Sequence, residues 1–252
     1  FKSTNFFKLS KLDLSIIKKN VPSNLVDIEI FDEIDSTNEE CKRSLSSKML
    51  SVKIANKQTK GRGRRGKNWS SPSLGNIYMS IAQKNVETDF PLSLSAGVIS
   101  YDAISSITEN EKLGLKWPND IIFDNKKVGG ILVEQEILGK DILSITGIGI
   151  NINLQDKEAW WGDLSGLGVE IKREEIINKI ILGFLNFKND NTVIKNKWES
   201  SCMHLQKKIK IIQDGNIIDE GTFKGINDDG SLLLQSKNNL KTYHFGEISI
   251  IG

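Results

Sequence analysis

The side chains best suited to binding an anion are concentrated in one short segment, residues 61–69, with the sequence GRGRRGKNW. It holds three glycines, three arginines and one lysine in nine residues. Glycine lets the backbone adopt positive φ and lets a ligand approach without a Cβ in the way. The arginine guanidinium pairs in a bidentate manner with carboxylate or phosphate. We therefore expect a loop that closes over a small anion.

Two simpler interpretations of this segment compete with an anion-binding loop. The spacing from Gly61 to Gly66 and Lys67 nearly matches a P-loop, but that motif needs Ser or Thr next and then a helix. Asn68 stands at that position, and the Ser-Ser-Pro that follows Trp69 prevents a helix. A basic cluster can also be a solvated patch or a non-specific nucleic-acid contact. The interpretation as a basic patch stays open until other residues are found to join the loop.

Other polar or glycine-rich stretches stand where predicted strands end. They are too polar and too rich in glycine for the strands that they terminate. They are Ser36-Thr37-Asn38, Gln58, Lys116-Trp117-Pro118-Asn119-Asp120, Lys127-Val128-Gly129-Gly130-Ile131 and Gly147-Ile148-Gly149-Ile150-Asn151-Ile152-Asn153.

Hydrophobic spacing predicts the elements that position these stretches. Ser36 with Glu39 forms the pattern of a capping box, which predicts a helix from there to about residue 48. Asp124-Asn125 predicts a tight turn of a hairpin. The predicted helices are 9–19, 36–48, 91–107, 170–187 and 192–204, and the predicted strands are 28–34, 52–58, 76–83, 113–116, 121–123, 126–134 and 141–153.

The pattern changes after His204. Five short strands follow, separated by turn sequences such as Asp214-Gly215-Asn216 and Asp228-Asp229-Gly230. They predict a small all-β barrel that folds as a second domain. The predicted strands are 207–213, 217–226, 231–234, 241–245 and 248–251.

Composition limits the class of protein. The 252 residues are 38% hydrophobic and 26% charged, as in ordinary globular proteins, and the net charge is only +2. A dedicated nucleic-acid-binding domain would be clearly basic. The two cysteines, Cys41 and Cys202, lack metal-site spacing and indicate reduced thiols in a cytoplasmic protein. We predict no protein-bound metal site and no membrane span.

Taken together and in this order, GRGRRG with Trp69, KWPND and the KxxGIL pattern from Lys127 resemble the biotin protein ligases. The resemblance covers roughly residues 30–155, and the small β-domain also fits the family. It implies an α+β fold: a catalytic domain, residues 1–204, with a mixed β-sheet flanked by helices as in biotin/lipoate ligases. A small SH3-like β-barrel, residues 205–252, follows. It also implies that biotin reacts with ATP, which binds together with Mg²⁺, to give biotinyl-5′-AMP and pyrophosphate.

The resemblance implies roles for individual residues. Arg62, Arg64 and Lys127 would neutralise the two anionic substrates during catalysis. Trp69 would pack on adenine, although an ordinary core aromatic is an alternative. The implied biotin-binding residues are Ser36, Thr37, Asn38, Gln58, Gly61, Arg62, Gly63, Arg64, Lys127 and Gly130. The implied nucleotide-binding residues are Arg62, Arg65, Trp69, Asn119 and Asn151.

The second half of the reaction implies a protein partner. Biotin would pass to one lysine of a biotin carboxyl carrier protein, a subunit of acetyl-CoA carboxylase or of another biotin-dependent carboxylase. About 30 residues precede the resemblance, so we expect a monofunctional ligase without an N-terminal repressor domain and without specific DNA binding. A homodimer is allowed. The rival classes are a lipoate or octanoate transferase of similar fold and a nucleic-acid-binding module.

Overall fold

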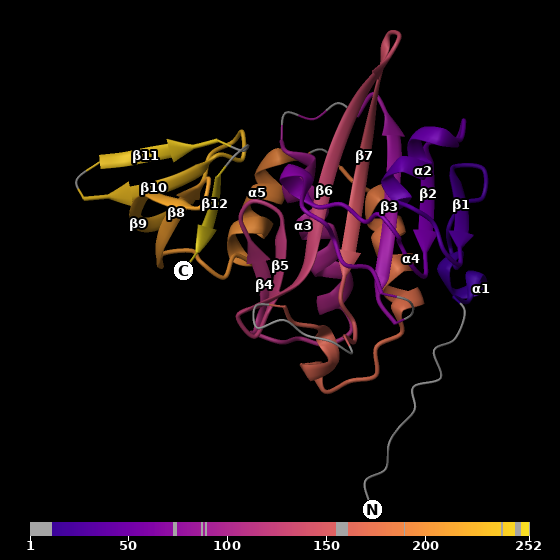
Figure 1. The fold of residues 1–252 in the computed structure, drawn as a ribbon, viewed down its shortest axis with the longest axis horizontal. Helices are drawn as coiled ribbons and strands as arrows, with labels where there is room; N and C mark the ends of the chain where they lie inside the picture. Colours follow the sequence, from indigo (N-terminus) through magenta and orange to yellow (C-terminus); the bar gives the residue numbers. More distant parts are fainter. Residues whose placement is uncertain are drawn as a thin grey trace, which may run out of the picture.

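The larger part of the protein is a seven-stranded mixed sheet (Figure 1). The computed structural model describes residues 12–72, 75–86, 88, 90–154, 161–188, 190–237, 239–244 and 248–251. Strands β1 and β2 are parallel, and every other neighbouring pair is antiparallel. The order across the sheet is β1-β2-β3-β7-β6-β5-β4. The strands are β1 (Val26–Phe31), β2 (Leu50–Ala55), β3 (Ile77–Lys84), β4 (Leu113–Lys116), β5 (Asp120–Phe123), β6 (Lys126–Leu138) and β7 (Asp141–Ile150).

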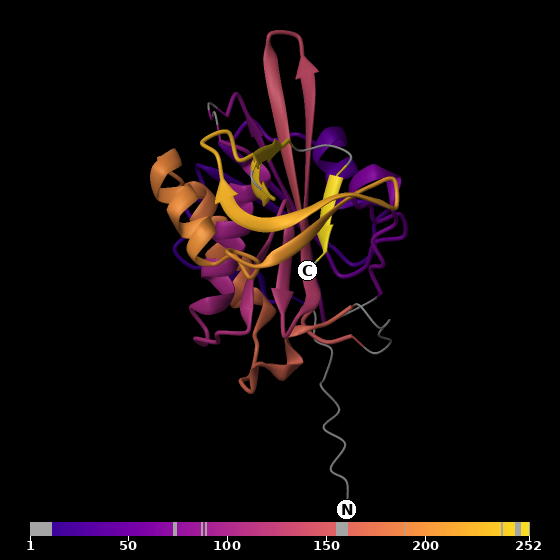
Figure 2. The same ribbon diagram turned by 90° about the vertical axis from the view of Figure 1, so that its left-hand side faces the viewer.

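The predicted turn at Asp124-Asn125 is confirmed and joins β5 to β6. Both turn residues have positive φ, 49° and 61°, as a two-residue hairpin turn requires. β6 continues to Leu138, beyond its predicted end at residue 134, and pairs with β7 from Gly129 to Leu138. The hairpin of β6 and β7 extends beyond the rest of the sheet (Figures 1 and 2).

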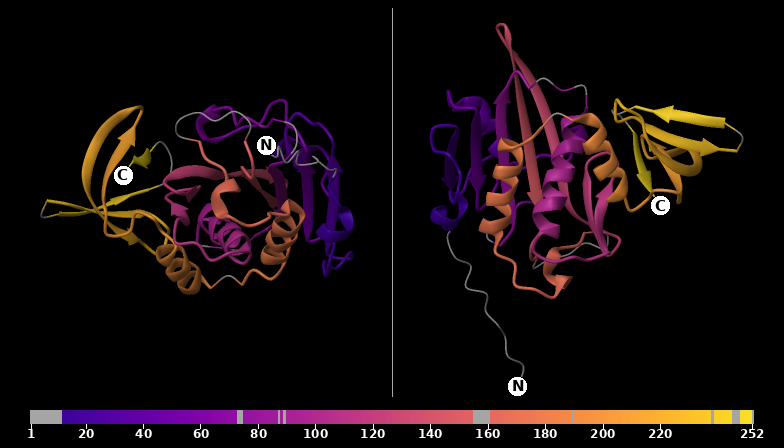
Figure 3. Two further views of the ribbon diagram at one scale, coloured as in Figure 1. Left: turned by 90° about the horizontal axis from the view of Figure 1, so that it is seen from below. Right: turned by 180° about the vertical axis from the view of Figure 1, so that it is seen from behind.

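Helices cover the two faces of the sheet unequally. α3 (Leu92–Ser105), α4 (Arg173–Leu185) and α5 (Asn191–Ser200) lie on one side of the sheet (Figure 3). On the other face α2 (Thr37–Arg43) contacts β2, β3 and β7. Most of that second face is left to loops, including the 3-10 turn η1 (Arg64–Gly66). The 3-10 turn η2 (Leu164–Leu167) contributes Leu164 and Leu167 to the main hydrophobic core, together with α3 and α4. No described helix is long and apolar enough to cross a membrane.

The structure corrects two helix predictions. The first helix, α1, spans only Leu14–Ile17 instead of 9–19, of which residues 9–11 lie outside the described part. α2 ends at Arg43 instead of about residue 48, because serines, which are weak helix formers, dominate the sequence that follows. Ser36 is its N-cap, but its side chain makes no capping hydrogen bond, so the capping-box prediction is wrong.

The C-terminal region forms an antiparallel sheet of five strands in the order β11-β10-β9-β8-β12. Bulges interrupt the register between Ile211 and Ile212 and between Leu233 and Leu234, so the sheet bends. Five strands were predicted, and the described residues form five. The domain boundary at residue 204 stays a prediction. They are β8 (Lys208–Gln213), β9 (Asn216–Ile226), β10 (Leu232–Ser236), β11 (Asn239–Tyr243) and β12 (Ile248–Ile251), and the predicted strand end at 245 lies outside the described residues.

This small sheet shares a hydrophobic core with the large one. Trp117, predicted as core, is 1% exposed and donates from Nε1 to the carbonyl of Gly230 at 3.0 Å. A Cβ on Gly230 would lie 2.7 Å from Cγ of Pro91, so the turn is in direct contact with the start of α3. The Trp198 and Phe223 rings meet edge to face at 6.3 Å. The two sheets are therefore packed together through α3 and α5.

Candidate functional site

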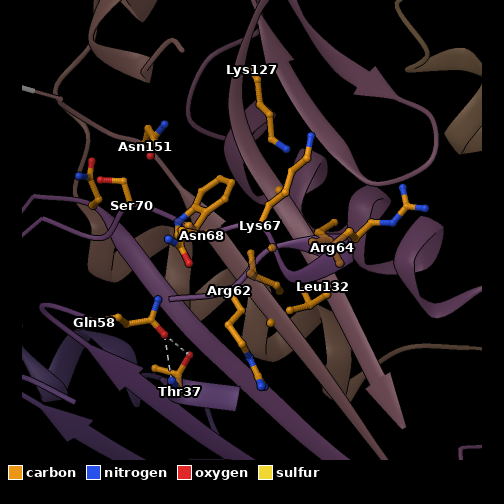
Figure 4. A pocket seen from close by; sticks show the side chains of 18 of the residues that line it. Thr37, Gln58, Arg62, Arg64, Lys67, Asn68, Ser70, Lys127, Leu132 and Asn151 are labelled. Atoms are coloured by element: carbon orange, nitrogen blue, oxygen red, sulfur yellow. Dashed lines mark hydrogen bonds between the residues drawn. The ribbon is translucent and has the colours of Figure 1, made fainter. Parts of the chain in front are cut away.

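A cavity of about 380 Å³ lies on the face of the sheet that α3 and α4 do not cover. It brings together stretches that are far apart in sequence: the start of α2, Gln58, the 61–69 loop, the KWPND segment and the glycines of β6 and β7 (Figure 4). The predicted site residues that line it are Ser36, Thr37, Asn38, Gln58, Arg62, Gly63, Arg64, Arg65, Trp69, Asn119, Lys127, Gly130 and Asn151. Gly61 alone among the predicted set does not line it.

The floor of the cavity is a network of buried polar groups. The backbone N–H and the hydroxyl of Thr37 both donate to Oε1 of Gln58, at 2.9 and 3.2 Å (Figure 4). Nε2 of Gln58 donates in turn to Oγ of Ser71 at 3.0 Å. Ser36, Thr37 and Asn38 are 3%, 3% and 4% exposed. A ligand that reached this floor would meet oriented donors and acceptors with little water between them.

Glycines in β6 and β7 make room for the indole of Trp69. A Cβ on Gly149 would lie 2.6 Å from Cε2 of Trp69, and one on Gly130 would lie 3.0 Å from Cζ3. The ring therefore lies against bare backbone in the cavity, and its Nε1 is buried without a hydrogen-bond partner among the described residues. Trp69 is thus a wall of the cavity as well as a packed aromatic.

Gly61 has a different reason to be glycine. A Cβ there would lie 2.5 Å from the carbonyl oxygen of Trp69, at the point where the two ends of the loop meet. The N–H of Trp69 donates to the carbonyl of Gly61 at 2.9 Å. Its contribution is to close the base of the loop.

Lys127 lies at the centre of the charged wall. Its Nζ is 2.6 Å from a carboxylate oxygen of Asp120 and 5.4 Å from the centroid of the Trp69 ring. Its side chain is only 25% exposed. Lys126, which directly precedes it, is exposed. Lys127 therefore lines the cavity, and Lys126 is not among its lining residues.

Lys116 is a second cation next to Asp120 that sequence reasoning passed over, although it is not among the residues that line the cavity. It pairs with Asp120 across β4 and β5, so the two side chains share one face of the sheet. Burial lowers the pKa of Lys116, Asp120 opposes that shift, and Lys127 adds to it. Asp120 thus lies between two ammonium groups. The sequence signal was the lysine that opens the KWPND segment itself.

The arginines of the loop have different surroundings. Arg64 reaches Oδ1 of Asn119 at 3.3 Å, and burial lowers its pKa, with Arg65 adding to the shift and Asp120 opposing it. Arg62 instead pairs with Glu39 and Glu134, on the α2 side of the cavity. Figure 4 shows Arg62 on the side of Thr37 and Lys127 on the opposite side.

The two predicted asparagines are held by backbone. Asn119 Nδ2 donates to the carbonyl of Ile131 at 2.7 Å, and Asn151 Nδ2 donates to that of Gly162 at 3.1 Å. Each still has an amide side chain at the cavity wall. Among the described residues no cluster of three His, Cys, Asp or Glu side chains could hold a metal ion.

Sequence reasoning also missed Glu39, Glu134 and Ser80. Ser80 donates within the floor to Oγ1 of Thr37 or Oδ1 of Asn38, at 2.7 and 2.5 Å. Glu134 accepts from Asn38 and Arg62. A buried serine in the apolar strand 76–83 and a glutamate after the apolar run 131–133 were the available signals.

Two family models match the chain. The biotin/lipoate A/B protein ligase family matches residues 30–153, and the biotin protein ligase C-terminal domain matches residues 204–250. The first range contains all of the predicted site residues, and the second contains the small sheet up to its penultimate residue.

Individual proteins agree with this match. A biotin protein ligase from Aquifex aeolicus, solved in complex with biotin and ATP, has a TM-score of 0.75 and 32% identity, covering 89% of this chain and 98% of that one. The bifunctional ligase/repressor BirA of Escherichia coli is 29% identical over 88% of this chain and 74% of its own length. A biotin–[acetyl-CoA-carboxylase] ligase from Paracoccus denitrificans is 28% identical over 72% of this chain and 82% of its own.

Proposed function

The chain belongs to the biotin/lipoate A/B protein ligase family, and we propose that it is an ATP-dependent biotin protein ligase. The observation that carries the proposal is the cavity itself. It joins a buried polar floor to a wall of cations and an aromatic ring within about 380 Å³.

The floor suits the ureido ring of biotin. That ring has two N–H donors and one carbonyl acceptor, and Thr37 and Gln58 offer matching groups in a buried network. The biotin-binding residues we propose are Ser36, Thr37, Asn38, Gln58, Gly61, Arg62, Gly63, Arg64, Lys127 and Gly130. Gly61 enters this set through the closure of the loop base.

The other end of the cavity suits a nucleotide. Trp69 offers an aromatic face for adenine, and Asn119 and Asn151 offer amide groups at the wall. We propose Arg62, Arg65, Trp69, Asn119 and Asn151 as nucleotide-binding residues. The Mg²⁺ that accompanies ATP would find hard oxygen donors in Asn119 and Asp120.

Charge is the main obstacle in the first step. A carboxylate oxygen of biotin must attack the α-phosphorus of ATP, and pyrophosphate leaves as biotinyl-5′-AMP forms. Two anions repel each other, and fixed cations in a site poor in water reduce that repulsion. Arg64 and Lys127 face the cavity, Arg62 stays in the predicted catalytic set, and Lys116 supports the same wall from behind Asp120.

In the second step the amine of a lysine attacks the carbonyl carbon of the mixed anhydride. An amide forms, AMP leaves, and one proton is released. We propose that the lysine belongs to a biotin carboxyl carrier protein of acetyl-CoA carboxylase or of another biotin-dependent carboxylase. A cytoplasmic location is supported by the two free cysteines, and a homodimer stays a prediction.

Isothermal titration tests the substrate class. Biotin should bind with micromolar or tighter affinity, and lipoate and octanoate should not. Biotin-dependent exchange of labelled pyrophosphate into ATP should then show the first step without a carrier protein. Binding of lipoate in preference to biotin would instead identify a lipoate ligase or transferase on the same fold.

A further inference from the structure

The side chain of Glu134 connects two parts of the cavity that come from separate segments of the sequence. Its carboxylate accepts a hydrogen bond from Nδ2 of Asn38, at 2.7 Å. Both of its oxygens lie 3.0 Å from Nη2 of Arg62. Asn38 belongs to the floor, and Arg62 belongs to the 61–69 loop. One carboxylate therefore holds a floor residue and a loop residue at once.

The geometry of the sheet explains why this strand can make the connection. Successive side chains of a strand point to opposite faces, so Gly130, Leu132, Glu134 and Glu136 share the face on which the cavity lies. α2 lies on the same face and carries Asn38 and Glu39. Glu39 is the second acceptor for Arg62. The loop arginine is therefore held between a helix and a strand.

The floor side of this connection is rigid. Asn38 is 4% exposed, and its Oδ1 is within 2.5 Å of the Ser80 hydroxyl. A buried amide with both ends hydrogen-bonded has little freedom to rotate. Any ligand that moves or orders the floor must therefore change the position of the Glu134 carboxylate.

The loop side of the connection is the weaker one. Arg62 has a side chain that is 38% exposed, and residues 62–68 contain no apolar side chain that could anchor them in a core. Their attachment depends on polar contacts, of which those of Arg62 with Glu39 and Glu134 lie nearest the floor. Losing Glu134 would remove this path between the floor and Arg62, and would leave in place both Glu39 and the separate path from Gln58 through Ser71 to the Trp69 end of the loop.

We propose that Glu134 is a positioning residue that couples occupation of the cavity floor to closure of the 61–69 loop, because its carboxylate binds Asn38 and Arg62 together. Asn38 fixes the carboxylate, and the carboxylate fixes Arg62. In this role Glu134 does not touch the substrates. The inference rests on the proposed function, because biotin is the ligand expected on the floor.

The direct test is limited trypsin digestion of the full chain with and without saturating biotin. The loop contains several cleavage sites, and its protection is the ratio of the two cleavage rates. We expect biotin to protect the wild-type loop about fivefold or more, the lower end of ordinary coupling between sites. In Glu134→Gln, biotin still binds at high concentration, but the protection falls to nearly one.

Two further variants make the test specific. Glu136→Gln is the matched control, because Glu136 lies on the same face of β6 and pairs with Lys42 at 2.9 Å. Lys42 also lies 3.8 Å from Glu134, but within the described part of the chain Glu136 itself makes no hydrogen bond or ion pair with Asn38 or Arg62. It should keep the wild-type protection. Arg62→Met breaks the same connection from the loop side. Because the substitution removes one trypsin site, the protection of its loop is measured at the other arginine and lysine residues of the loop. By linkage, Glu134→Gln should weaken biotin binding by the wild-type protection factor. Arg62→Met should weaken it by at least that factor, because Arg62 is also a proposed biotin contact, and adding Glu134→Gln to Arg62→Met should cause no further loss.

The outcomes separate the coupling from the proposed function. If Glu134→Gln binds biotin and its loop is protected as in the wild type, the coupling is wrong. Independent, additive losses of affinity in the double variant would also overturn it. If Glu134→Gln fails to fold, the Arg62→Met variant provides the test. Wild-type protection of its loop together with an unchanged affinity for biotin rejects the coupling. A wild-type protein that binds no biotin removes the proposed function, whereas one that binds biotin with an unprotected loop removes only the coupling.

Discussion

Lys127 is the side chain on which the proposed first step depends most directly. It combines low exposure with a position between Asp120 and the Trp69 ring, facing the cavity. We predict that Lys127→Ala lowers the rate of biotin-dependent pyrophosphate release by about 100- to 1,000-fold, or ~2.7–4 kcal/mol of barrier, as for loss of one charge-stabilising contact. The free energy of unfolding should change little, because the ammonium group of Lys116 remains on the same face of the sheet and balances the charge of the Asp120 carboxylate.

The neighbouring lysine supplies the control for this prediction. Lys126→Ala changes the same residue type one position earlier on β6, but its side chain is exposed. Its rate of pyrophosphate release should match the wild type. If Lys127→Ala releases pyrophosphate at a near-normal rate, Lys127 is not the catalytic lysine.

The two cysteines are predicted to be unreactive while the protein is folded. Burial raises the pKa of both thiols, Cys41 and Cys202, from 9.0 to about 12. The thiolate is the reactive form, so at pH 8 its population falls by roughly three powers of ten relative to an unperturbed thiol. A coloured disulfide reagent should detect almost no thiol at pH 8 in the native protein and two thiols in guanidinium chloride.

The direction of the accompanying stability change follows from the same shifts. Both thiols are neutral in the folded and unfolded states below pH 9. Above that pH the unfolded chain loses protons first, so folding stability falls as the pH rises from 9 toward 12. Rapid labelling of either cysteine in native protein at pH 8 would contradict the burial that raises these pKa values.

At the scale of elements, the 61–69 loop is held by polar contacts. We predict that it is mobile without ligand and that biotin with ATP slows its cleavage by trypsin, because the ligands add negative charge beside its cations. Raising the salt from 0.05 to 0.5 M should also speed cleavage of the free protein by ~1.4- to 5-fold, since exposed ion pairs are worth about 0.2–1 kcal/mol and are screened by salt.

Cleavage after Lys140 provides the internal reference for both effects. Lys140 is exposed in the turn between β6 and β7, on the projecting hairpin and away from the cavity (Figure 1). Its rate should not respond to biotin or ATP, and it reports any effect of salt on trypsin itself. Equal rates in the loop with and without ligands, in protein shown to bind them, would mean that the loop is closed before ligands arrive.

For the whole molecule, the shared core of the two sheets has consequences for truncation. Trp117 and Trp198 are both 1% exposed and both contact the small sheet. Sequence alone suggested that the chain without residues 205–252 would remain folded. Removal exposes these rings, and we predict a loss of roughly 3 kcal/mol or more, which lowers Tm by about 6–12 °C in a domain of this size.

Thermal melting followed by far-UV circular dichroism measures this loss. The truncated chain should also biotinylate a carrier domain poorly, because α3 starts next to the cavity wall and packs against the small sheet at Pro91. An unchanged Tm together with full ligation activity would show that the small sheet is dispensable. The substitution Gly230→Ala probes the same contact in the full chain, since a Cβ there meets Pro91 and the residue has φ of 76°.

Local sequence patterns were sufficient for most elements. All predicted site residues except Gly61 also line one cavity, and their roles stay predictions. Alternating apolar residues, the Asp124-Asn125 turn and the break after His204 are short-range signals, because strand period and turn conformation depend on adjacent residues. The motif residues converge on one cavity because each motif stands at the end of a strand of the same sheet. Helix ends were less predictable: Ser36 opens α2 but does not cap it with its side chain.

Only the tertiary structure decided how the charges are paired. Residue types in GRGRRG predict cations, but Arg62 faces carboxylates of α2 and β6 while Arg64 reaches Asn119, and these partners come from positions 23 to 72 residues away. The roles of Glu134 and Lys116 arise in the same way, from strand register and from the face on which α2 packs. Sequence spacing determines which face a side chain occupies within its own strand. The partner across that face depends on how distant elements pack, which no local pattern specifies.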